Sequence, residues 1–169
     1  MNNPMYTASV PVFKQMLTGL KGVLAKADAH VTAKNIDPNA LLQARLYPDQ
    51  FHFTKQVYVA TDFAINISSK LANVDVQKLE DTDKTFAELI ARIERTLAIL
   101  DQLPAANFEA SDKREVIHNP GTPRERKFIG QAFLLTHGLP HFFFHVTTAY
   151  DILRHNGVEV GKRDYLANA

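Results

Sequence analysis

Apolar residues recur three and four positions apart in four long segments of the chain, and this spacing places them on one face of an α-helix. The segments lie near 6–29, 48–72, 83–103 and 130–155. The third segment is the most regular, and its apolar face consists of Phe86, Leu89, Ile90, Ile93, Leu97 and Leu100. The pattern therefore predicts four long amphipathic helices, each of which buries one face in a shared core.

Residues typical of helix ends support these limits. Pro48 and Asp49 suit a first helical turn, where a missing N–H is tolerated and a carboxylate is favoured by the helix dipole. The sequence TFAE at 85–88 has the spacing of a capping box, and Pro104 follows the same helix. Asn156-Gly157 is a strong stop for the last helix, because glycine accepts the left-handed conformation.

The region between the third and fourth helices has a different pattern. REVIH ends at His118, RERKFI ends at Ile129, and NPGTP lies between them. This arrangement predicts a short hairpin or ordered loop that packs on the helices, because two short strands are marginally stable alone. In the last helix, Pro140 removes the N–H that would bond to the carbonyl of Thr136, so a kink is expected there.

Together these elements predict an all-α four-helix bundle, with the hairpin as an insertion, in a single domain over 1–169. Apolar residues make up 46% of the chain and charged residues 22%, which is typical of a globular protein. No apolar run is long enough for a membrane span, and the first ten residues lack the order of a signal peptide. A cytoplasmic location is therefore expected.

Charge and cysteine content narrow the possible chemistry. A net charge of +1 gives no strong field for a nucleic acid, so neither nucleic acid nor membrane is expected as a partner. The chain has no cysteine, which excludes disulfides, thiolate nucleophiles and Cys-ligated metals. A bound metal would have to use His, Asp, Glu or amide oxygens.

Four of the seven histidines lie within 137–155, and two of them raise the question of a metal. His141 and His145 are four residues apart, so their side chains stack on one helix face and could share a metal ion. The zinc-protease version is excluded, because Phe142 stands where that motif has glutamate. The alternative is that both are core histidines, hydrogen-bonded near Pro140 or to threonine hydroxyls. The spacing allows both interpretations.

The sequence also predicts roles for the other histidines. His137 is expected to act at the kink, His155 to complement the dipole at the helix end, and His118 to be exposed. His52 is the one histidine outside the last helix that falls on an inward sector, which it shares with Gln56. It is therefore the best candidate for a third metal ligand.

Two segments carry a resemblance to a known family: LPHFFFHVTTAYDILRHNGVEVGKRDYL at 139–166 and LYPDQFHFTKQVYVATDFA at 46–64. They resemble a bacterial family of unknown function in the DinB/YfiT-like superfamily of metalloenzymes. The resemblance implies an up-down-down-up four-helix bundle that is often a homodimer. Many members of that superfamily hold a divalent metal with one histidine of the second helix and an HxxxH pair of the last.

Carried over to this chain, the HxxxH pair matches His141 and His145. The usual place of the second-helix histidine falls near Val59, while His52 and Gln56 lie on the same face one to two turns earlier. The resemblance thus implies a zinc or nickel site that uses His141 and His145, and His52 is the candidate for its third ligand. Such a metal would lower the pKa of a bound thiol or water and present it as a nucleophile.

The competing hypothesis is a metal-free protein that binds a small ligand or forms a structural homodimer. Phe142, Phe143 and Phe144 are consecutive, so they cannot all face one direction on a helix. At least one of them must therefore face a neighbouring element, a ligand or a second subunit. Both functions remain open from the sequence.

Overall fold

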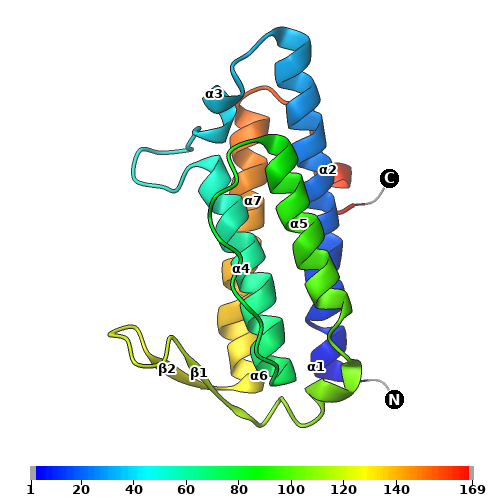
Figure 1. The fold of residues 1–169 in the computed structure, drawn as a ribbon, viewed down its shortest axis with the longest axis vertical. Helices are drawn as coiled ribbons and strands as arrows, with labels where there is room; N and C mark the ends of the chain where they lie inside the picture. Colours follow the sequence, from blue (N-terminus) through cyan, green and yellow to red (C-terminus); the bar gives the residue numbers. More distant parts are fainter. Residues whose placement is uncertain (1–2, 168–169) are drawn as a thin grey trace.

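Four long helices run side by side along the long axis of the molecule in the computed structural model, which describes residues 3–167 (Figure 1). They are α2 (Val10–Lys34), α4 (Phe53–Ala72), α5 (Phe86–Asp101) and α7 (Leu139–His155). Helix α4 packs against α7 and α5, and α2 packs against α5 and α7. The chain is mostly helical with a small two-stranded sheet, which confirms the predicted helical fold in its coarse form.

Short elements connect and cover the long helices. They are α1 (Pro4–Thr7), α3 (Pro38–Leu42), the 3-10 turn η1 (Ala105–Phe108), α6 (Gly130–Ala132), the π-helical segment η2 (Phe133–Gly138) and α8 (Lys162–Tyr165). The apolar faces of the long helices meet in one hydrophobic core, as their spacing predicts. Within the described part of the chain, no helix is both long enough and apolar enough to cross a bilayer.

Two helix starts differ from the predicted ones. The first predicted helix is divided into α1 and α2, since Ser9 donates to the Met5 carbonyl (2.6 Å) in place of a continued helix and Pro11 begins the next turn. The predicted start of the second helix at Pro48 is wrong. Helix α4 begins at Phe53, because the backbone N–H of Phe53 bonds to the Ala44 carbonyl (2.9 Å) and keeps the preceding residues in a loop.

The predicted capping box and hairpin are both present. The Thr85 hydroxyl accepts from the backbone N–H of Glu88, and the Glu88 carboxylate accepts from the backbone N–H of Thr85, which fixes the start of α5. Strands β1 (Glu115–His118) and β2 (Arg126–Ile129) pair antiparallel. Their turn contains Gly121 at a φ of 72°, a conformation that glycine adopts without strain.

The last helix absorbs Pro140 differently from a simple kink. The chain is helical from Gly130 to His155, but the turn before the proline is the wider π-helix η2. In a π-helix each N–H bonds to the carbonyl five residues back instead of four. The hydrogen-bond pattern of the helix therefore changes just before Pro140, the residue that lacks an N–H. A side chain adds one more hydrogen bond in this segment: the Thr136 hydroxyl donates to the Ala132 carbonyl (2.7 Å).

A buried arginine holds the connector between α4 and α5. Arg92 of α5 has no exposed surface, and its guanidinium donates to the Thr61 hydroxyl of α4 (2.7 Å). The same group pairs with Asp62 (2.9 Å), Asp81 (3.1 Å) and Asp83 (3.2 Å). Two of these carboxylates belong to the connector, so the network fastens an otherwise irregular segment to both helices.

Candidate functional site

His141 and His145 lie one turn apart on α7, on the side that faces α4, but an aromatic ring faces them there. The Phe63 ring stacks on His141, with centroids 4.9 Å apart, and on His145, with centroids 5.9 Å apart. His145 is buried, whereas His141 is exposed, so the prediction that both face the interior is wrong for His141. Helix α4 thus presents the phenyl ring of Phe63 to both histidines.

The hydrogen bonds of His145 define its tautomer. The Gln56 amide nitrogen donates to the Phe51 carbonyl (3.0 Å), so the Gln56 Oε1 faces His145. An amide oxygen only accepts, and therefore Nδ1 of His145 must carry the proton across this contact of 2.7 Å. The other ring nitrogen, Nε2, then carries a lone pair. Gln56 is buried, as its predicted inward position requires.

Burial, followed by the neighbouring His141, lowers the pKa of His145 to about 4. The ring is therefore neutral at pH 7. A base of such low pKa is poorly matched to removing a proton from a thiol or from water near neutral pH. A neutral imidazole with a fixed lone pair is instead a good hydrogen-bond acceptor.

His52 has a different position from the predicted one. It is the N-cap of α4, outside the helix, and its Nδ1 accepts from the backbone N–H of Lys55 (3.3 Å). The sector assigned to it on a helical wheel therefore does not apply. Among residues 3–167, no hydrogen bond or ring contact joins His52 to His141 or His145.

The structure does not bring His52, His141 and His145 together as a metal-binding group. Across the described residues, no cluster of three or more His, Cys, Asp or Glu side chains could hold a metal ion. The donor set also fits a metal poorly, since a nitrogen of His52 caps a helix and Phe63 packs on the HxxxH pair. The arrangement of this face is one of stacked rings.

Two further histidines extend the same face, and the sequence did not indicate their meeting. His137 lies in η2, and its ring contacts His141 (centroids 4.5 Å apart) and His118 at the end of β1 (4.6 Å). His118 is half-buried, which corrects the prediction that it is exposed. Burial and then the other imidazoles lower the pKa of His137 to about 4. Both rings carry a buried nitrogen with no hydrogen-bond partner: Nε2 of His137 and Nδ1 of His118.

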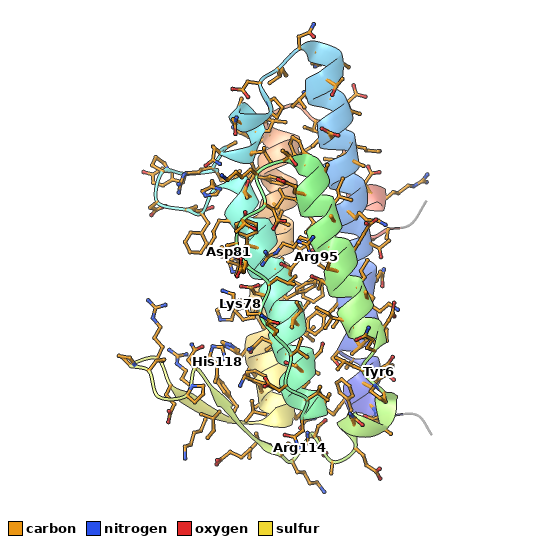
Figure 2. All side chains as sticks on the ribbon, in the orientation of Figure 1. Tyr6, Lys78, Asp81, Arg95, Arg114 and His118 are labelled. Atoms are coloured by element: carbon orange, nitrogen blue, oxygen red, sulfur yellow. The ribbon has the colours of Figure 1, made fainter. Side chains whose placement is uncertain are left out.

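A cavity of about 350 Å³ opens beside Phe63 and His118. It lies between α4, the connector that follows α4, and the end of β1. Figure 2 shows Lys78 and His118 on this side of α4. Its lining is Val59, Asp62, Phe63, Ile65, Asn66, Ser69, Val76, Lys78, His118 and Asn119. Four of these residues are apolar and six are polar, so the wall offers an apolar surface together with groups that can orient a small molecule.

The fold and this face define a class: a mostly helical protein with a histidine-rich face between its second and last long helices. The family described as a domain of unknown function, DUF1993, matches residues 5–166. The chain therefore belongs to the DUF1993 family. No curated protein is detectably similar to it.

A solved structure is also similar over nearly the whole chain. It is the crystal structure of a DinB family member protein from Shewanella denitrificans at 1.83 Å resolution. The two chains are 38% identical, with a TM-score of 0.88, and the match covers 95% of this chain and 90% of the other. The predicted resemblance to a DinB-like family of unknown function is confirmed.

Proposed function

We propose that this protein binds a small, largely apolar ligand at His145 without the help of a metal ion. The observation that carries the proposal is the fixed tautomer of His145, which leaves the Nε2 lone pair without a protein hydrogen bond among the described residues. Three phenyl rings contact this imidazole: Phe63 at 5.9 Å, Phe51 at 6.4 Å and Phe144 at 5.3 Å between centroids.

The surroundings define the ligand chemistry. Phe51 and Phe144 are about half exposed, at 49% and 56%, so a ligand can reach them from solvent. An apolar body would cover these rings, and an O–H or S–H group of the ligand would donate to Nε2 of His145. Aromatic side chains with a small number of polar groups that orient the ligand are also the side chains that small-molecule sites use.

The alternative is the metal-dependent enzyme that the family resemblance implies, with zinc or nickel at His52, His141 and His145. We take the fold to be a four-helix bundle of DinB/YfiT type. In such an enzyme the metal would activate a thiol or water. A catalytic zinc usually has three protein ligands and an open position. The present positions of His52 and Phe63 favour metal-free binding, since they supply no third ligand.

Phenol and toluene serve as probes for the His145 site, because they differ by one hydroxyl. Phenol is expected to bind up to about tenfold more tightly than toluene, which is the value of one hydrogen bond. In His145→Phe the preference disappears, while the matched variant His141→Phe keeps it. Equal binding of the two probes to the native protein would exclude His145 as the acceptor.

Metal binding needs its own measurement. Isothermal titration of the untagged protein with zinc and with nickel is expected to show no site whose affinity depends on His52. If His52→Ala, His141→Ala and His145→Ala each abolish a tight stoichiometric site, the metal-dependent alternative is correct and the proposal fails.

We also propose a homodimer made by packing helix faces, which covers exposed apolar side chains outside the His145 site, among them Ile129 and Leu135. A standard stable interface buries about 1,200–2,000 Å² in total. Light scattering at micromolar concentration is expected to give twice the mass of the chain, and Leu135→Ser is expected to shift the protein toward monomer. A native monomer would contradict this part of the proposal.

A further inference from the structure

The cavity beside Phe63 is distinct from the His145 site, although the two share that ring. Its apolar lining comes mainly from α4 and the following connector: Val59, Phe63, Ile65 and Val76. At about 350 Å³ its volume is near the lower end of the range for small-molecule sites. The cavity therefore suits one small, flat molecule that packs against the Phe63 ring.

One cation and one carboxylate lie at the rim of the cavity. Lys78 pairs with Asp62 (3.2 Å), but Asp62 also pairs with the buried Arg92 (2.9 Å). The guanidinium of Arg92 is also paired with Asp81 and Asp83, so Lys78 is the cation that the rim of the cavity presents. The Lys78 side chain remains 69% exposed, so its ammonium is free to contact a second anion.

Cations also lie close to the opposite wall, at the end of β1. Lys70 donates to the Ile117 carbonyl (2.9 Å), next to His118. Burial lowers the pKa of His118, and Lys70, His141 and Arg126 lower it further, with no carboxylate among the contributing groups. A negative group near His118 is therefore favoured by the local field.

His118 itself has unused hydrogen-bonding capacity. Its Nδ1 is buried with no partner, and no hydrogen bond joins its ring to another described residue. The ring of His118 therefore has a hydrogen-bonding group that no described residue uses. Asn66 and Asn119 add amide groups at the same opening.

We propose that this cavity binds a small organic monoanion with a flat apolar body, of the aromatic carboxylate class. The ring of the ligand packs on Phe63, and its carboxylate lies between Lys78 and His118. The site goes beyond the proposed ligand at His145, because it selects an anion and uses different polar groups.

Benzoate and benzamide test the proposal, because they have nearly the same shape and differ in charge. The native protein is expected to bind benzoate at least about tenfold more tightly than benzamide, as hydrogen bonds to charged groups allow. The bound probe should shift the backbone resonances of Asn66 and Asn119. Lys78→Met keeps the length of the side chain and removes its charge, so it should weaken benzoate binding and leave benzamide unchanged.

Lys127→Met is the matched control, because Lys127 is similarly exposed but lies on β2 and outside the cavity lining. It should leave the benzoate affinity as it is. The proposal is overturned if benzoate fails to reach tenfold over benzamide, or if Lys78→Met and Lys127→Met have the same effect. The His145→Phe variant separates the two sites: it should abolish the preference for phenol and preserve the binding of benzoate.

Discussion

Replacing Arg92 by methionine tests the energetic role of the buried network between α4 and α5. Methionine keeps much of the volume and length of the arginine stem but removes the guanidinium. The lost partners are the Thr61 hydroxyl, the Glu80 carbonyl and the carboxylates of Asp62, Asp81 and Asp83. The Tyr58 ring, 4.5 Å from the guanidinium carbon, also loses a cation–π contact.

The loss of unfolding free energy in Arg92→Met depends on how well water can solvate the three carboxylates once the guanidinium is gone. The Asp83 side chain is only 7% exposed, whereas Asp62 and Asp81 are about a quarter exposed. Removing one partner of a buried ion pair costs about 3–5 kcal/mol, because the remaining charge stays desolvated. Since two of the three carboxylates are partly hydrated, we expect about 3–4 kcal/mol of lost unfolding free energy, within that range.

Arg95 is the matched control for this prediction. It pairs with the same Asp83 at 3.1 Å, but its side chain is 50% exposed. An exposed pair is worth about 0.2–1 kcal/mol, so Arg95→Met should have a small effect. The two variants remove the same charge from the same helix, and they differ in burial and in the number of partners that lose a contact.

Urea unfolding followed by circular dichroism measures the free energy of unfolding of the native protein and both variants. For a chain of this size, a loss of about 3–4 kcal/mol corresponds to a fall in Tm of roughly 6–16 °C. The reasoning is refuted if Arg92→Met costs no more than Arg95→Met. That result would mean that the connector carboxylates find other solvation when the arginine is gone.

The remaining predictions concern two glycines and one buried histidine. In α2, a Cβ at Gly19 would lie 2.3 Å from the carbonyl oxygen of Tyr165, whereas a Cβ at Gly22 meets nothing within 4 Å. Thermal unfolding should therefore show Gly19→Ala destabilised and Gly22→Ala stabilised by up to about 1 kcal/mol. The pKa of His137 is lowered from the ordinary 6.5 to about 4 in the folded protein. Between these two values the unfolded chain binds more protons than the native state, so stability falls as the pH drops through this window. His137→Phe removes this loss, and its unfolding free energy relative to the native protein should rise by about 1–2 kcal/mol from pH 7 to pH 5; an equal rise for the exposed control His155→Phe would contradict the assignment.

Much of the helical fold is predictable because its signals are local. The capping box of Thr85 and Glu88 joins groups three residues apart, and the apolar stripe of α5 needs only the helical period. The hairpin was also predictable, since its turn residues and short strands are contiguous. The start of α4 was not predictable from Pro48, because a tertiary contact from Phe53 to Ala44 decides it.

The candidate site was predictable only in part. The spacing of His141 and His145 placed them one turn apart on α7, but the ring that faces them belongs to α4. The contact between His145 and Gln56 joins residues 89 positions apart, and no local pattern reports it. Arg92 likewise reads as an ordinary charged residue beside an apolar stripe, and only the returning connector explains its burial.

The sequence by itself determined the helical period, the caps, the hairpin turn and the types of donor available to any ligand, because these depend on neighbouring residues and on composition. The tertiary structure decided which donors meet. It placed His52 at a helix end, brought His118 to His137 across the hairpin, and set Phe63 against the HxxxH pair. These outcomes depend on how the packed helices are rotated and offset relative to one another. Side-chain packing across the core sets that rotation and offset, and the spacing of residues along the sequence does not specify it.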